Sequence, residues 1–244
     1  MKRILTILTG TLLALDVSAQ VNSYVSSRYG IVNQLETYGR VSYQGLNYFP
    51  TGTDSLLVKN DVCKSDSIIF LSSLSIDNKP YVVSGFRDMA FEFDTDLKYI
   101  EIPSTFTEVS NSCFYQCSNL RGCMMPDIKV IQGFAFFRTG FQNLTLHEGL
   151  EYIGASAFQE CSKLESVELP STLEYIGDNA FLGCEQLTTV KVNFDKPIEL
   201  GSNVFWLYRP NRPRKHKTLM VPAGSKPAFE AHEQWRLFQT IVEH

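Results

Sequence analysis

Six cysteines and four histidines are the residues of this sequence that could bind a metal or take part in nucleophilic and acid–base chemistry. The histidines are His147, His216, His232 and His244, away from the positions at which cysteines recur. The sequence has no nucleophile elbow, no phosphate-binding glycine loop and no zinc-protease helix. We therefore expect no metal site, no cofactor and no enzymatic activity, and we assign the acidic side chains to solvent positions that keep the protein soluble.

The N-terminus has the three parts of a secretory signal peptide. Lys2 and Arg3 form a basic head, an apolar run extends from Ile4 to Leu15, and the small residues at 17–19 suit signal peptidase. The apolar run is too short to span a bilayer, and no later stretch is apolar enough to do so. We expect cleavage after Ala19 and a secreted, periplasmic or cell-surface protein. An uncleaved anchor is the alternative.

The charge of the chain is small and unevenly spread. The formal net charge is −4 at pH 7, which argues against a nucleic-acid binder. The stretch from Leu200 to Phe229 contains no acidic residue, and its basic residues are Arg209, Arg212, Arg214, Lys215, Lys217 and Lys226. The rest of the chain is therefore strongly acidic. Its length suits one domain, and it is large enough to bury a core.

A repeat dominates the central part of the chain. Phenylalanines recur with spacings of 22 to 24 residues, at Phe91, Phe114, Phe136, Phe158, Phe181 and Phe205. A large apolar residue stands five positions before each of them, and a small or medium-sized residue stands directly before. A second apolar group follows, for example Leu164, Val167 and Leu169 after Phe158. The chain therefore consists of similar coils over this region.

Alternation with period two at Val167 and Leu169 predicts a short strand with one inward face. One coil cannot bury this face alone, but coils stacked at about 4.8 Å build a continuous core with the phenylalanines along its interior. We expect strands centred near Ile100, Cys123, Leu144, Val167 and Val190. Gly154, Gly177 and Gly201, four positions before a repeat phenylalanine, are expected to form turns with positive φ.

The repeat also accounts for most of the cysteines. Six cysteines in an exported protein would suggest three disulfides, but Cys117, Cys161 and Cys184 all stand three residues after a repeat phenylalanine. Cys113 takes the small-residue position and Cys123 an inward strand position. Cysteine packs well as a small hydrophobe, and adjacent coils would hold the Cβ atoms about 5 Å apart instead of the ~3.8 Å of a disulfide. We predict six free thiols.

The repeat resembles a known family. Residues 152–164 read YIGASAFQECSKL and residues 175–184 read YIGDNAFLGC, which is similar to the BspA-like leucine-rich repeat. The end of the chain, with LMVPAGS at 219–225 followed by Phe229, Trp235 and Phe238, resembles the C-terminal cap of that family. The resemblance covers residues 68–244. It implies an exported bacterial surface protein that binds host or microbial partners and has no enzymatic activity.

We therefore predict a mainly β fold with few short helices, a right-handed leucine-rich-repeat solenoid of about five 22–24-residue coils with a cap at each end. The predicted organisation is a signal peptide at 1–19, a strand-rich N-terminal cap at 20–67, the solenoid at 68–205, and a basic loop and C-terminal cap at 206–244. The cap should contain one helix with Ser225 as N-cap and Pro227 in its first turn. We expect Phe229, together with Trp235 or His232, to face the last coil.

Two features could bind a ligand. The first is an exposed column in which Tyr152 and Tyr175 stack beside Glu151 and Glu174, an amphipathic patch of the kind found at interfaces. The alternative is that tyrosine simply suits exposed strand positions.

The second feature is the basic segment, which two prolines keep extended. We expect it to contact an acidic extracellular protein or an acidic glycan. The residues concerned are Arg209, Arg212, Arg214, Lys215 and Lys217. The alternative is a solvated loop.

The sequence thus predicts a monomeric, non-catalytic binding or adhesion module that recognises a protein or glycan outside the cytoplasm. A structural envelope component without a specific ligand is the alternative. Two tripeptides that begin at Asp54 and Asp66, each Asp-Ser followed by an aliphatic residue, resemble an acceptor site for bacterial O-glycosylation.

Overall fold

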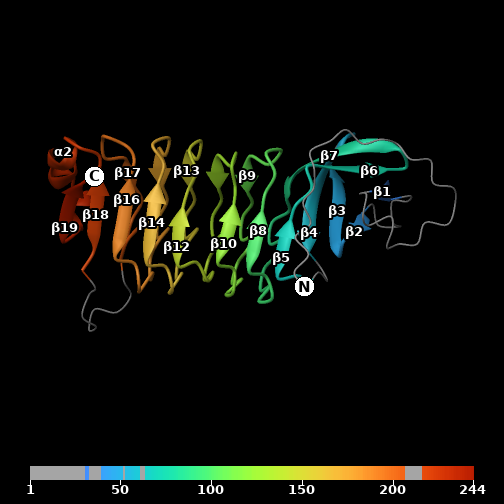
Figure 1. The fold of residues 1–244 in the computed structure, drawn as a ribbon, viewed down its shortest axis with the longest axis horizontal. Helices are drawn as coiled ribbons and strands as arrows, with labels where there is room; N and C mark the ends of the chain where they lie inside the picture. Colours follow the sequence, from blue (N-terminus) through green and yellow to red (C-terminus); the bar gives the residue numbers. More distant parts are fainter. Residues whose placement is uncertain (1–30, 33–39, 52, 61–63, 207–215) are drawn as a thin grey trace.

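The computed structural model describes residues 31–32, 40–51, 53–60, 64–206 and 216–244 (Figure 1). The predicted signal peptide, Cys63 and residues 207–215, which hold most of the basic segment, lie outside the described residues. The described chain is an elongated stack of coils, with a mixed sheet at its N-terminal end and a short helix at its C-terminal end.

Short parallel strands form one side of the stack. They pair in register, for example Ile68 with Ile100 and Val167 with Val190. The strands are β5 (Ser67–Ile69), β8 (Tyr99–Glu101), β10 (Gly122–Met124), β12 (Asn143–Thr145), β14 (Ser166–Leu169), β16 (Thr189–Val192), β18 (Thr218–Val221) and β19 (Thr240–Glu243). The five predicted strand positions are confirmed. The stack is longer than five coils because β5, β18 and β19 extend it at its two ends.

Pairing on this side is interrupted between β10 and β12, where Figure 1 shows a wider spacing than between neighbouring strands. The coil that contains Phe136 has one residue fewer between this phenylalanine and its strand than the other coils have, and Phe141 stands where they have leucine. The shorter segment draws Gly140 against the preceding coil, where an added Cβ would lie 2.5 Å from the Ser118 carbonyl oxygen. The altered length and the larger ring explain why β12 pairs only with β14.

A second side carries a ladder of two-residue strands that is continuous over five coils. Its outward and inward residues alternate, with Val109, Ile131, Ile153 and Ile176 fully buried. The strands are β9 (Glu108–Val109), β11 (Val130–Ile131), β13 (Tyr152–Ile153), β15 (Tyr175–Ile176) and β17 (Glu199–Leu200).

The repeat phenylalanines form a continuous stack inside the third side, which consists of turns. Neighbouring ring centroids lie 5.1 to 5.5 Å apart with nearly parallel planes. All of the rings are buried except that of Phe205 at the end of the stack, which is partly exposed. The predicted interior column is therefore confirmed.

The turns around the repeat phenylalanines from Phe91 to Phe181 use left-handed residues at two positions, two before and two after the ring. Around Phe114 these are Ser112 and Gln116, with φ of 52° and 57°. Alternate N–H groups then point along the stack, so Ser112, Phe114 and Gln116 donate to carbonyls of the next coil, while Tyr115 closes a local turn. The left-handed conformation costs an L-residue about 1–2 kcal/mol, which the bonds between coils offset.

The prediction of positive φ at Gly154, Gly177 and Gly201 was wrong, because none of these glycines is left-handed. Each is required by close approach instead. An added Cβ on Gly177 would lie 2.6 Å from the Ala155 nitrogen, and one on Gly201 would lie 2.4 Å from the Asp178 nitrogen. Here the coils touch backbone to backbone, so there is no room for a side chain.

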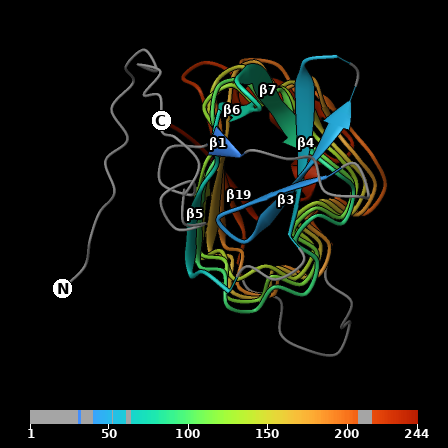
Figure 2. The same cartoon turned by 90° about the vertical axis from the view of Figure 1, so that its right-hand side faces the viewer.

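The N-terminal end is covered by a six-stranded mixed sheet (Figure 2). Its order is β1 (Ile31–Val32), β6 (Ser73–Ile76), β7 (Lys79–Phe86), β4 (Ser55–Asn60), β3 (Leu46–Thr51) and β2 (Val41–Tyr43). The sheet thus continues past residue 67 to Phe86, while β5 already belongs to the solenoid ladder. Phe86 and Phe70 pack edge-on against Phe91, which closes the end of the phenylalanine stack.

The C-terminal end is covered by α2 (Lys226–Ala231) and the 3-10 helix η1 (Trp235–Leu237). The predicted helix is confirmed with Ser225 at its N-cap, but the Ser225 hydroxyl donates to the Pro222 carbonyl and does not cap the helix. Phe229 and Trp235 are fully buried, and Trp235 packs 5.8 Å from Phe205. They close the hydrophobic core at this end.

Candidate binding surfaces

The structure brings the predicted tyrosines together on the side formed by the two-residue strands. Tyr152 in β13 pairs in register with Tyr175 in β15, and their rings stack with centroids 5.5 Å apart at 19°. Tyr152 is 38% exposed. Ile153 and Ile176, the next residues in the same strands, are fully buried, so the strands are anchored in the core and the stacked ring pair presents an apolar surface to solvent.

The predicted glutamates lie directly beside these tyrosines. Glu151 and Glu174 are exposed and adjacent, since the Glu174 N–H donates to the Glu151 carbonyl at 2.9 Å. Lys129 of the preceding coil forms an ion pair with Glu151 at 3.8 Å. The column can therefore offer two carboxylates, one ammonium group and two phenol rings to a partner.

The basic segment is described only at its end. Arg209, Arg212, Arg214 and Lys215 lie outside the described residues. The backbone N–H of Lys217 donates to Gln239 Oε1 at 2.8 Å, and its Nζ donates to the Phe205 carbonyl at 2.5 Å. Lys217 thus ties the last coil to the C-terminal cap.

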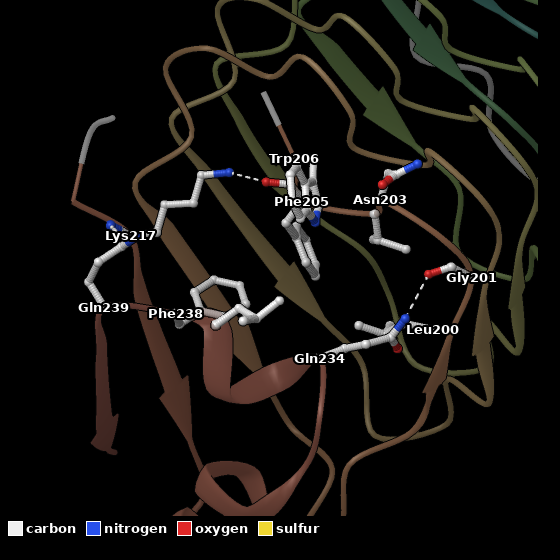
Figure 3. A pocket seen from close by; sticks show the side chains of 11 residues that line it. Leu200, Gly201, Asn203, Phe205, Trp206, Lys217, Gln234, Phe238 and Gln239 are labelled. Atoms are coloured by element: carbon white, nitrogen blue, oxygen red, sulfur yellow. Dashed lines mark hydrogen bonds between the residues drawn. The ribbon is translucent and has the colours of Figure 1, made fainter. Parts of the chain in front are cut away.

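A cleft that the sequence did not predict lies between the last coil and the cap (Figure 3). Its volume is about 250 Å³, and its lining is mainly apolar. The residues that line it are Leu200, Gly201, Asn203, Val204, Phe205, Trp206, Lys217, Gln234, Leu237, Phe238 and Gln239. Trp206 and Leu237 are 51% and 58% exposed at its edge. The sequence signal for this cleft was a tryptophan directly after the last repeat phenylalanine.

The polar groups of this cleft are largely engaged within the chain. Gln234 Nε2 donates to the Gly201 carbonyl at 3.1 Å, and Lys217 reaches the Phe205 carbonyl, as Figure 3 shows. The cleft is therefore suited to an apolar or aromatic group rather than to a charged one.

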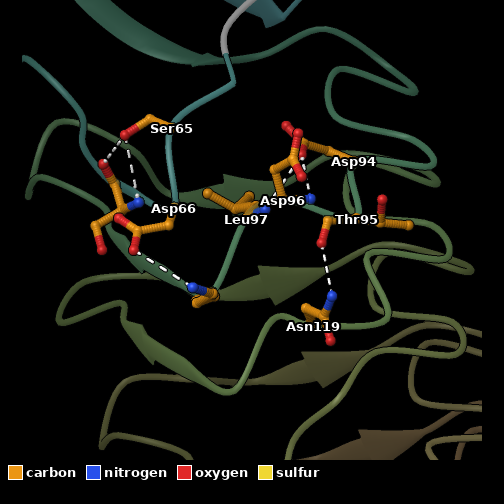
Figure 4. A network of polar contacts seen from close by, with 9 residues as sticks. Ser65, Asp66, Asp94, Thr95, Asp96, Leu97 and Asn119 are labelled. Atoms are coloured by element: carbon orange, nitrogen blue, oxygen red, sulfur yellow. Dashed lines mark hydrogen bonds and ion pairs between the residues drawn. The ribbon is translucent and has the colours of Figure 1, made fainter.

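A polar network lies around the turn at residues 94–97 of the first coil (Figure 4). Asp94 accepts hydrogen bonds from the backbone N–H groups of Asp96 and Leu97 and from the Asn60 amide. Burial raises the pKa of Asp94, although these donors oppose the shift. Asn119 donates to the Thr95 carbonyl at 2.8 Å. Because its partners belong to the chain itself, we assign this network a structural role.

The cysteines that the structure describes are all free, and all are buried except Cys123, which is partly exposed. Cys117, Cys161 and Cys184 donate to the carbonyl of a repeat phenylalanine in the preceding coil, over 3.0 to 3.3 Å. Cysteine therefore serves in this column both as a small apolar residue and as a weak donor. No group of three His, Cys, Asp or Glu side chains in the described part of the chain could hold a metal ion.

The two tripeptides that resemble glycosylation sites lie on strands. Ser55 in β4 is partly buried, and its hydroxyl donates to the Thr51 carbonyl. Ser67 in β5 is exposed. Of the two serines, Ser67 is therefore the more accessible in the folded chain.

These coils match a family model described as the BspA type leucine rich repeat region, with six copies over residues 84–208. The chain belongs to this family. The matched range contains all six repeat phenylalanines. Proteins with these repeats are characteristically bacterial surface proteins that bind partners.

Solved leucine-rich-repeat structures share the fold of this BspA-type protein. One from Bacteroides ovatus is 18% identical, covering 83% of this chain and 67% of that one, with a TM-score of 0.50. The T. pallidum leucine-rich-repeat protein is 21% identical over 68% and 87% of the two chains, with a TM-score of 0.51. A leucine-rich cell surface protein from Faecalibacterium prausnitzii is 19% identical, covering 75% of this chain and 54% of that one, with a TM-score of 0.53. At these identities the likeness concerns the fold alone.

A search of curated proteins finds no match to the chain. In the described residues, no helix has the length and apolar character needed to cross a membrane.

Proposed function

We propose that this protein is a non-catalytic binding or adhesion module that acts outside the cytoplasm and recognises a protein or glycan partner. The observation that carries the proposal is the stacked pair Tyr152 and Tyr175, held in register beside Glu151 and Glu174 on a rigid ladder. Rigid aromatic residues with adjacent charged groups are the usual anchors of an interface. Membership of the BspA-type family and the cell-surface description of the Faecalibacterium neighbour support this function.

The signal-peptide pattern at residues 1–19 supports export, and the basic segment supports an acidic partner. The residues that would contact that partner are Arg209, Arg212, Arg214, Lys215 and Lys217. The guanidinium groups offer paired donors to carboxylate or sulfate groups, so the arginines should contribute more than the lysines.

Binding of the purified protein to immobilised matrix proteins and acidic glycans tests this function. We expect saturable binding to at least one of them, weakened at least tenfold by Tyr152→Ser with Tyr175→Ser. Thr145→Ser, an exposed change on β12, is the matched control and should leave binding unchanged. Binding to none of the probes would favour the alternative, a structural envelope component without a specific ligand.

A further inference from the structure

A cluster of aromatic rings lies on the turn side of the first coils, away from the tyrosine ladder. We define the aromatic patch as Phe93, Tyr115, Phe134 and Phe137. Tyr115 and Phe137 stack with centroids 4.7 Å apart and planes at 6°. Phe93 lies 5.6 Å from Tyr115 at 80°, and Phe134 lies 5.9 Å from Phe137 at 57°, so both rings turn out of the plane of the stack. Phe93 is 57% exposed and Phe134 is 39% exposed.

The backbone beneath the exposed rings makes their presence costly. Phe93 and Phe134 occupy the left-handed positions beside the repeat phenylalanines, with φ of 61° and 55°. Elsewhere in the repeats only Met89 at these positions is apolar, and the remaining residues are polar or glycine, namely Ser112, Gln116, Arg138, Ser156, Glu160, Asn179, Gly183 and Asn203. Folding therefore does not require an aromatic side chain at either place. A cluster of exposed apolar residues at positions where the fold does not require them indicates an interaction site.

A polar hollow continues from the aromatic patch along the same side of the stack. Its lining includes Ser118, Arg138, Glu160, Ser162, Lys163 and Glu185. Arg138 joins the two regions, since its guanidinium lies 5.1 Å from the Phe137 ring centroid and its Nε donates to Glu160 Oε2 at 2.6 Å. Aromatic rings and hydrogen-bonding groups thus follow one another across about 20 Å, the height of four steps between coils.

The charges of the hollow balance, with two cations, Arg138 and Lys163, and two anions, Glu160 and Glu185. A balanced set does not favour an ion as ligand. It does favour hydroxyl groups, because carboxylates accept from them, cationic groups donate to them, and serines do both. A protein partner would have to bury these charged groups at a desolvation cost, whereas a hydroxyl-rich ligand keeps them hydrogen-bonded.

We propose that the aromatic patch and the polar hollow together form a binding site for a neutral oligosaccharide. The C–H face of a sugar ring packs on the exposed faces of Phe93 and Phe134, and the hydroxyl groups of the following sugars bond to Arg138, Glu160 and Lys163. This site rests on the proposed binding function and adds a ligand class and a surface that the tyrosine ladder does not provide.

The test uses the purified protein and neutral glucan, mannan, xylan and galactan hexasaccharides, with heparin fragments and matrix proteins as other probes. The decisive variant is Phe93→Gln with Phe134→Asn, because Gln116 and Asn179 already occupy these left-handed positions in other coils. We expect calorimetry to show binding of a neutral hexasaccharide that changes little with salt. The variant should weaken it at least tenfold and keep the thermal midpoint close to that of the parent.

Thr145→Ser, an exposed change on β12, is the matched control and should leave saccharide binding intact. The proposal is overturned if no neutral saccharide binds or if the variant binds as tightly as the parent. Binding of heparin or a matrix protein alone, sensitive to the tyrosine variants, would overturn the saccharide site and uphold the proposed function. Binding of no probe at all would count against both.

Discussion

Phe158 is fully buried between Phe136 and Phe181, with ring centroids 5.3 and 5.1 Å away. Phe158→Ala would leave a cavity that the neighbouring coils cannot fill, because their backbones are bonded to one another. We expect the free energy of unfolding to fall by about 3–5 kcal/mol, measured by chemical denaturation. Phe93→Ala at the exposed surface is the control and should cost less than about 1 kcal/mol. A cost near zero at Phe158 would mean that the phenylalanine column does not form the core.

Gly177 is needed because the adjacent coil leaves no room for a side chain. In Gly177→Ala the new Cβ would lie 2.6 Å from the Ala155 nitrogen, so we expect a loss of about 1–3 kcal/mol from overpacking. Gly224→Asn is the matched control, since Gly224 is left-handed, exposed and has open space around its Cβ position. It should change the stability by less than about 0.5 kcal/mol. Equal effects of the two changes in a thermal melt would contradict the close-approach explanation.

Burial raises the pKa of Cys117 and of Cys123 to about 12, from an ordinary value of about 9. Between these pKa values the folded protein holds protons that the unfolded chain releases. The contribution of the two protonated thiols to the free energy of unfolding is therefore complete below pH 9 and is lost as the pH rises toward 12. We expect the free energy of unfolding to fall over this window.

The matched variant for this pH effect is Cys117→Thr with Cys123→Val, because the same columns hold Thr139 and Val167 in other coils. Its stability should decline less steeply between pH 9 and pH 11 in urea titrations, and a parallel decline would exclude the two thiols as the cause.

Thiol titration of the denatured, non-reduced protein should find six free groups, and two or fewer would indicate disulfides.

At the scale of elements, the C-terminal cap covers an end of the core that would otherwise be open. Phe229 and Trp235 pack against Phe194, and β19 pairs with β18. Deleting residues 225–244 would expose these surfaces and the edge of β18, which is a template for further strand pairing. We expect aggregation of the truncated protein in size-exclusion chromatography with light scattering. The full chain with Arg236→Ala, an exposed change in η1, is the control, and a soluble monomeric truncation would show that the cap is dispensable.

At the scale of the whole molecule, the sequence concentrates positive charge between Arg209 and Lys217, while the rest of the chain is acidic. Such a separation would steer an anionic partner to the basic segment, with an attraction that salt screens over about 8–10 Å. For an acidic ligand such as heparin, we expect affinity to fall as salt rises. Replacing Arg209, Arg212, Arg214, Lys215 and Lys217 with serine should flatten this dependence. If the affinity of the parent protein does not change with salt and the replacement leaves it unchanged, the segment is a solvated loop without a binding role.

The sequence by itself determined the repeat architecture. The regular return of Phe91 to Phe205 and the alternating apolar pairs allow only one arrangement that buries every copy, which is a stack of similar coils. The same reasoning placed the strands, the buried cysteine positions and the cap helix. It also brought Tyr152 and Tyr175 together, because equivalent positions in adjacent coils must become neighbours.

Only the tertiary structure decided features that depend on contacts between backbones or between different positions of the repeat. The close approach at Gly177 is invisible in one coil, since the Ala155 nitrogen that excludes a side chain belongs to the coil before it. The break between β10 and β12 arises from one missing residue acting on a neighbouring strand. Phe93 and Phe134 come together through Tyr115 and Phe137, which stand at other positions of their repeats. The sequence repeat aligns like positions, and only the folded backbone shows which unlike positions meet.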